Sequence, residues 1–343
     1  MLLDTLKALC PLFGPSGLED EVSAYIRREA EPFADQIIET KTGALLVHKR
    51  GKKKPKFTVM LAAHMDEVGV IVKEIDSSGF LKFACVGGVD RRVLMGKAVF
   101  LGEKRVPGVI GMKPIHLTTG EERKSVPKIK DLYIDIGAAS KEEAEALVEP
   151  GDYGCFDPAF LELQNGFVCS KAIDDRLGCA LMLETLKQDL PVDVWFAFTV
   201  QEEIGSKGAF GAAFEIQPDI VLVLEATSAA DVSPNKEADQ VCGPLKGPVI
   251  SLLDKGTVYD PDLFRILTGI AEEKGLAWQV KTRMVGTTDA RAAIAAVGGC
   301  RAAGISAPVR YIHSPSCVGN VKDFEAMKVM LDAFLEKMED YHG

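Results

Sequence analysis

The hydrophobic and polar positions follow one pattern towards the two ends of the chain and another in its middle. Apolar residues spaced three and four apart predict helices at residues 2–10, 18–31, 174–187, 207–214, 260–274, 288–296 and 321–338. Continuous apolar runs between them predict strands at residues 36–39, 44–48, 57–63, 192–200, 220–224 and 300–309. Because such strands have no polar face, we expect a sheet covered on both faces by helices.

Between residues 70 and 168 the pattern changes to short β-rich runs. They lie at 70–75, 80–86, 98–101, 106–110 and 132–136, and only one short helix is predicted, at 141–148. Glycine, proline and charged turns separate these runs, which is typical of a small β-barrel or sandwich. We therefore predict an α/β fold in which residues 1–70 and 164–343 form one domain and residues 71–163 form an inserted β domain.

Composition and charge exclude several functional classes. The 343 residues are 47% apolar and 26% charged, as in an ordinary globular protein and unlike a disordered one. The net charge of −10 argues against general nucleic-acid binding. We see no apolar run long enough for a membrane span and no basic signal-peptide region. The eight cysteines are scattered without a CxxC pair, as free buried thiols would be, so we expect a cytoplasmic protein.

Candidate chemistry gathers where the predicted strands end. His64, Glu202, Glu203, Glu225 and His313 each lie just past the carboxyl end of an apolar run. In open α/β sheets this edge is where ligands bind. Two histidines with several carboxylates form a zinc-like ligand set. For each residue taken alone a structural role stays open, such as that of an exposed acid in a turn.

Further acids accompany this set. Asp66 shares a strand face with His64, so it is placed to orient a metal-bound imidazole. Asp174 and Asp175 open a predicted helix, where a capping role and a ligand role are both open. Three coordinating carboxylates against two divalent cations would leave one positive charge, which favours a bound hydroxide at neutral pH.

Seven motifs, in the same order along the chain, resemble the M42 metallo-aminopeptidases. They are LAAHMDEVG at 61–69, GGVD at 87–90, GVIG at 108–111, AIDDR at 172–176, QEEIG at 201–205, GTTDA at 286–290 and RYIHSP at 310–315. The resemblance runs nearly end to end. It implies a zinc-peptidase-like catalytic domain and an enzyme that hydrolyses the N-terminal residue from short peptides with a free N-terminus.

The resemblance also implies the metal ligands. Two divalent metal ions would be bound, zinc or cobalt, with manganese as a further candidate. Asp174 would bridge them. His64 and Glu225 would complete the shell of one metal, and Glu203 and His313 would complete the shell of the other.

The same resemblance implies the catalytic roles and the assembly. Glu202 would be the general base that takes a proton from the bridging water and returns it to the leaving amine, while Asp66 orients His64. The inserted β domain is similar to the dimerisation domain of the family. Such a domain implies a homo-oligomer in which dimers assemble into a tetrahedral dodecamer.

The sequence departs from the family pattern at three places. Glu225 stands where many relatives have aspartate, and Ser316 and Cys317 stand where valine and glutamate are frequent. Arg291 stands where relatives often have glycine. The cation at this position leads to the hypothesis that Arg291 favours substrates with an acidic N-terminal residue.

Other functional classes stay open. A metal-independent glycoside hydrolase of the endoglucanase type would use Glu202 with Glu203 or Glu225 as acid and base. That mechanism leaves His64 and His313 without a role, and aromatic residues for stacking on sugars make up only 7% of the chain. A related di-metal carboxypeptidase or deacylase would not need a free substrate amine. A non-enzymatic scaffold would use the same residues only for structure.

Overall fold

The computed structural model describes residues 1–232, 240–281, 283–296 and 298–341. Its main element is an eight-stranded sheet with the order β1-β2-β12-β3-β13-β16-β14-β15. The four central strands, β12, β3, β13 and β16, are parallel, so their carboxyl ends meet at one edge. The strand bounds are Gln36–Glu39 (β1), Leu45–Lys49 (β2), Val59–His64 (β3), Val194–Thr199 (β12), Ile220–Ser228 (β13), Val249–Ile250 (β14), Gln279–Val280 (β15) and Arg301–Val309 (β16).

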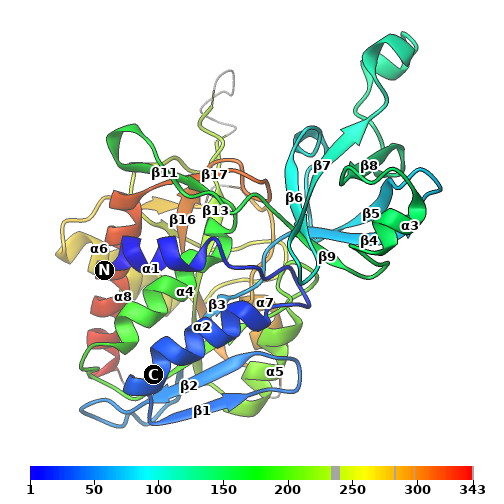
Figure 1. The fold of residues 1–343 in the computed structure, drawn as a ribbon. Coiled ribbons are helices and arrows are strands. Elements are labelled where there is room, and N and C mark those ends of the chain that lie inside the picture. The colour runs from blue at the N-terminus through cyan, green and yellow to red at the C-terminus, as the bar shows by residue number, and fades with distance from the viewer. Residues whose placement is uncertain (233–239, 282, 297, 342–343) are drawn as a thin grey trace.

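Helices cover the sheet on both sides (Figure 1). On one side α4 packs against β3 and β13, α8 packs against β16, and α1, α2 and α6 lie against these two helices. On the other side α5 and α7 pack against each other and against β12, β13 and β16. The helix bounds are Leu2–Leu9 (α1), Asp20–Ala30 (α2), Ile173–Leu186 (α4), Lys207–Ile216 (α5), Pro261–Glu273 (α6), Ala290–Ala295 (α7) and Val321–Met338 (α8). The predicted mixed α/β fold is confirmed.

The β-rich middle of the chain closes into a six-stranded barrel with the order β4-β5-β8-β7-β6-β9. The barrel has a hydrophobic cluster of its own, which includes Leu81, Ile110 and Ile134. The helix α3 (Lys141–Glu145) is shorter than predicted. The strands are Gly69–Ile75 (β4), Leu81–Val86 (β5), Ala98–Leu101 (β6), Val106–Met112 (β7), Leu132–Asp135 (β8) and Tyr153–Phe156 (β9). The division of the chain into domains at residues 71 and 163 stays a prediction.

The barrel lies beside the α/β unit, and the segment after β7 projects away from both (Figure 1). Arg105 joins the barrel to the N-terminal segment. Its guanidinium lies 3.5 Å from the centre of the Phe13 ring and 2.5 Å from the Glu21 carboxylate.

A small separate sheet consists of β10 (Leu161–Glu162), β11 (Phe167–Ser170) and β17 (Cys317–Asn320). Among the described helices, none is long and apolar enough to cross a bilayer.

Two predictions about strand ends are wrong. The strand β13 continues to Ser228, so Glu225 lies within it, and His64 is the last residue of β3. Both strands end later because their backbones stay paired with a neighbouring strand: β13 pairs with β16 up to Ser228 and Val309, and His64 pairs with Thr199 of β12. The side chains of His64 and Glu225 therefore lie on adjacent parallel strands, where they can contact each other.

Candidate active site

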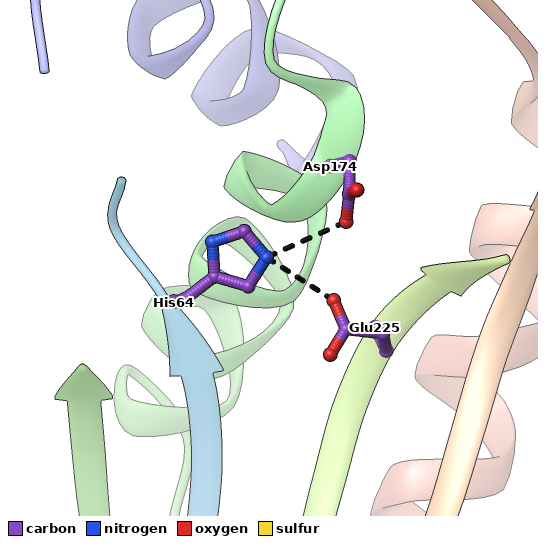
Figure 2. A group of neighbouring side chains, drawn as sticks. All are labelled: His64, Asp174 and Glu225. Carbon is purple, nitrogen blue, oxygen red and sulfur yellow. Dashed lines mark ion pairs between the residues drawn. The ribbon is translucent and has the colours of Figure 1, made fainter. Parts of the chain in front are cut away.

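The first group of ligand-type side chains joins two strands and the start of α4 (Figure 2). The His64 Nε2 atom lies 3.2 Å from Glu225 Oε1 and 3.5 Å from Asp174 Oδ1. All three residues are buried. The opposite ring nitrogen, Nδ1, lies 3.0 Å from the backbone carbonyl of Asp66, which fixes the imidazole so that Nε2 faces the two carboxylates.

A second group shares Asp174 with the first. The other oxygen of Asp174, Oδ2, lies 3.3 Å from His313 Nε2, and that nitrogen lies 3.4 Å from Glu203 Oε2. In each group the ligand atoms lie within 4.8 Å of one another. The structure therefore brings all five predicted ligands together as two groups of three with Asp174 in common.

The local backbone explains why Asp174 is available. Asp174 and Asp175 have non-helical dihedral angles, although they lie inside the bounds of α4. Asp175 Oδ1 accepts a hydrogen bond of 2.8 Å from the backbone amide of Gly178, so Asp175 caps the helix. The capping role that the sequence left open thus belongs to Asp175, and the carboxylate of Asp174 faces His64 and His313.

Two oxygen atoms in the first group lack a hydrogen-bond partner among the described residues. They are Asp174 Oδ1 and Glu225 Oε2, and both are buried. Asp174 Oδ1 has only its 3.5 Å ion-pair contact with His64. Leaving a buried carboxylate oxygen without a hydrogen bond is costly, because burial removes the water that would otherwise solvate it. Nitrogen and oxygen donors in this arrangement are the ligands that divalent zinc, cobalt and manganese accept. The residues present therefore fit a pair of divalent cations.

The pKa shifts of the two groups also indicate sites for cations. Burial raises the pKa of Glu203 to about 7 and that of Glu225 to about 8, and the charge of Asp174 adds to both shifts. Burial lowers the pKa of His313. The hydrogen bond to Asp174 and the charge of Glu203 outweigh this effect of burial, so the pKa of His313 is raised to about 9. Crowded carboxylates thus retain protons, which bound cations would displace.

The turn after β12 carries Glu202 and Glu203, and the carboxylate of Asp66 binds the backbone of this turn. The backbone amides of Glu202 and Glu203 donate to Asp66 Oδ1 and Oδ2 at 2.9 and 3.1 Å. The Asp66 carboxylate is 3.5 Å from His64 Nδ1, further than its own backbone carbonyl. Orienting His64 through that carboxylate stays a prediction, whereas the contacts with the turn give Asp66 a second role that the sequence analysis missed.

Two residues of the N-terminal segment also help to hold the turn that carries Glu202 and Glu203. Ser16 donates a hydrogen bond of 2.5 Å to Asp66, and Glu19 accepts one of 3.1 Å from the backbone amide of Gln201. Gln201 has a left-handed φ of 58° and lies beyond the end of β12, so Glu19 supplies the acceptor for its backbone amide outside the sheet. The sequence analysis assigned no role to Ser16 or Glu19, which lie between and at the start of the first two predicted helices. The Gly-Pro-Ser-Gly break at residues 14–17, two residues before Glu19, is the one local signal that could have drawn attention to them.

The two groups open into a pocket of about 370 Å³. Glu202 lines it, and Ser206 donates a hydrogen bond of 3.2 Å to the Glu202 carboxylate. Burial raises the pKa of Glu202 well above its usual range. Gly88 brings the barrel into this pocket, where a Cβ atom at that position would lie 3.4 Å from His313 Nδ1. Lys281 is the single lysine or arginine among the described lining residues.

Known proteins share this arrangement over nearly the whole chain. Residues 43–330 match the family model of the M42 glutamyl aminopeptidase. A protein of Acetivibrio thermocellus, named as an aminopeptidase, is 36% identical over 335 residues, which cover 97% of this chain and 98% of that protein. An aminopeptidase structure from the archaeon Desulfurococcus kamchatkensis has a TM-score of 0.93 at 34% identity, covering 99% of this chain and 96% of the other.

Two more solved structures bear on assembly and on the alternative functions. The Pyrococcus horikoshii TET1 peptidase, described as assembling into a tetrahedron or a large octahedral shell, has a TM-score of 0.85 at 34% identity and covers 98% of this chain and 99% of its own. A Thermotoga maritima structure described as an endoglucanase has a TM-score of 0.80 at 31% identity, with 97% and 99% covered.

Because Asp174 belongs to both groups, its loss should have a different effect from the loss of any other ligand. We expect calorimetric titration of chelator-stripped protein with Zn²⁺ or Co²⁺ to give two binding events. Glu225→Gln should weaken one of them and Asp174→Asn should weaken both. The control is Glu215→Gln, an exposed acid on α5, which should bind both ions normally. An Asp174→Asn protein that keeps one event at full affinity would show that the two groups do not share this ligand.

Proposed function

The chain belongs to the M42 glutamyl aminopeptidase family, a family of peptide-bond hydrolases, and we propose that it is a di-metal aminopeptidase. Its substrates would be short peptides with a free N-terminus, from which it removes the first residue. The observation that carries this proposal is the pair of ligand groups that share Asp174 at the carboxyl edge of the parallel strands. Such a shared carboxylate is suited to hold two cations close together.

The five ligand-type residues would hold one metal ion in each group. His64, Glu225 and Asp174 would hold the first, and Asp174, Glu203 and His313 would hold the second. When bound, two divalent ions supply Lewis-acid polarisation of the scissile carbonyl and lower the pKa of a coordinated water. Zinc and cobalt suit these nitrogen and oxygen donors, and manganese is a further candidate.

Glu202 would act as the general base. Its carboxylate lies in the pocket beside both groups but belongs to neither, so it is free to accept a proton from the attacking water. Its raised pKa brings proton uptake and release closer to neutral pH, which a residue needs if it is to pass the same proton to the leaving amine. The Ser206 hydroxyl holds one carboxylate oxygen, and Asp66 holds the backbone of the turn, so Glu202 has a defined position.

The charge of the pocket depends on the bound ions. Asp174, Glu202, Glu203 and Glu225 line it, with His313 and Lys281 as basic residues. Two divalent ions would offset these four carboxylate charges, so the choice between the two ends of a peptide rests on the family. The family model is that of an aminopeptidase, which supports an aminopeptidase over the related carboxypeptidase. Membership of a peptidase family supports it over the glycoside hydrolase, which also gives the two histidines no role.

The β-barrel insert would form the contact between subunits. Exposed apolar side chains lie on β7 and on the segment that projects after it, among them Ile115 at 70% and Leu117 at 59% exposure. Apolar groups at such a tip are costly in water unless another surface covers them. Together with the assembly described for the TET1 peptidase, they support a homo-oligomer in which dimers form a tetrahedral dodecamer.

Replacing the proposed base should remove activity without removing metal. We expect Glu202→Gln to lower kcat for aminoacyl-nitroanilides by about 10²- to 10⁴-fold, because the amide cannot accept the proton. Metal content should stay at the wild-type value, and Glu215→Gln should be fully active. Wild-type rates in the Glu202→Gln protein would assign the base to another residue or support a non-enzymatic scaffold.

Metal removal and a blocked substrate separate the competing functions. Chelator-stripped protein should not cleave a leucyl peptide, and added Zn²⁺ or Co²⁺ should restore cleavage. The same peptide with an acetylated N-terminus should resist hydrolysis in every condition. Cleavage of the acetylated peptide would instead identify a carboxypeptidase or deacylase, and chelator-resistant hydrolysis of a glucan would identify a glycoside hydrolase.

The assembly has a separate test. Light scattering should give a mass of several chains, with twelve as the value for a tetrahedral dodecamer. The substitution Ile115→Asp should shift the protein to smaller species, because burying a charge in an apolar contact costs free energy. A wild-type protein that is monomeric at micromolar concentration contradicts the proposed oligomer while leaving the proposed chemistry open to its own tests.

A further inference from the structure

A second pocket adjoins the catalytic pocket on the side of α5 and α7. It measures about 440 Å³, and Gly205 and Thr287 line both pockets. The remaining lining is supplied by the two helices and the turn before α5, including Lys207, Phe210, Arg291 and Ala292. A ligand that extends out of the catalytic pocket past Gly205 would therefore enter the second pocket.

The second pocket is lined by side-chain cations without an acidic counterpart. Among the described lining residues, the ionisable ones are Lys207 and Arg291, with no carboxylate beside them. In the catalytic pocket, four carboxylates are present to balance the two proposed divalent ions. A ligand whose reacting end lies in the catalytic pocket and whose far end carries a carboxylate is the complement of a basic pocket placed beside it.

Lys207 stands at the boundary between the pockets. Its ammonium group donates a hydrogen bond of 2.6 Å to the backbone carbonyl of Ile204, which fixes its direction. A Cβ atom built on Gly205 would lie 3.6 Å from this nitrogen. The ammonium therefore sits directly over the residue that both pockets share, and it keeps two further N–H donors for a ligand.

Arg291 is held by its aliphatic stem and keeps its charged end available. A Cβ atom on Gly256 would lie 2.5 Å from Arg291 Cδ, so the side chain runs closely along this glycine. Within the described part of the chain, the guanidinium forms no ion pair and no side-chain hydrogen bond. An arginine positioned in this way presents a fork of donors that matches a carboxylate. Arg291 does not line the catalytic pocket, so the structure gives it a place different from the one that our sequence hypothesis assumed.

We propose that this second pocket binds the C-terminal carboxylate of a short peptide whose free amine lies in the catalytic pocket. The inference rests on the proposed aminopeptidase function. An extended peptide spans at most about 3.3–3.6 Å per residue, so a pocket that adjoins the catalytic pocket is within reach of the first few residues of a peptide. Phe210 and Ala292 provide an apolar wall for the last side chain. Short peptides with a free carboxylate are then the preferred substrates.

The kinetic test compares Leu-Ala-Ala with Leu-Ala-Ala-amide, which differ only in the C-terminal charge. The wild-type protein should show a KM about tenfold lower for the acid, with similar kcat. Arg291→Gln and Lys207→Gln should raise the KM of the acid towards that of the amide. Neither variant should change cleavage of leucyl-nitroanilide, which has no carboxylate. Lys56→Gln, an exposed cation in the loop before β3, is the matched control and should change nothing.

The outcomes separate this inference from the proposed function. Equal KM values for acid and amide in the wild type would overturn the carboxylate site. A loss in Arg291→Gln confined to glutamyl-nitroanilide would also overturn it and restore the hypothesis of an acidic first residue. Absence of cleavage of every substrate would contradict the aminopeptidase function. A binding titration of both peptides to Glu202→Gln protein then decides the inference, because a tenfold preference for the acid that Arg291→Gln removes needs no catalysis.

Discussion

Mutual repulsion between buried carboxylates is the constraint on which this structure depends. Asp174, Glu203 and Glu225 lie within two overlapping groups, and Glu202 lines the same pocket. Taking such charges out of water is unfavourable unless cations or protons balance them. Burial raises the pKa of Glu203 and of Glu225, and the charge of Asp174 adds to both shifts. A protein that keeps this arrangement needs both a rigid framework and a positive counter-charge, and the two proposed metal ions supply the second.

The framework comes from the whole length of the chain. The parallel pairing of β3 and β13 brings His64 and Glu225 together, and the non-helical start of α4 presents Asp174 to both histidines. Asp66 and Glu19 hold the backbone of the turn at residues 201–203 through its amide groups. The barrel adds Gly88 at the rim. Each contact joins segments far apart in the sequence, so the site forms only when the whole fold has formed.

The sequence predicted the main helices and the long apolar strands because each carries a local period that burial imposes. It missed β9, β10, β11, β14, β15 and β17, which have two to four residues and too few positions to show a period. The ligand residues were predicted from their place near strand ends and from the family resemblance. Their grouping around Asp174 was also implied by that resemblance. The support from Glu19 and the place of Arg291 outside the catalytic pocket depend on tertiary contacts, which no local pattern encodes.

The most direct test of the central claim is anomalous diffraction from crystals of the wild-type protein grown with Zn²⁺ or Co²⁺. Our account predicts two anomalous peaks in each subunit, about 3.5–4 Å apart, with the Asp174 carboxylate between them. His64 and Glu225 should contact one peak, and Glu203 and His313 should contact the other. A single peak, or two peaks of which only one contacts Asp174, would contradict the claim that this carboxylate joins two metal sites.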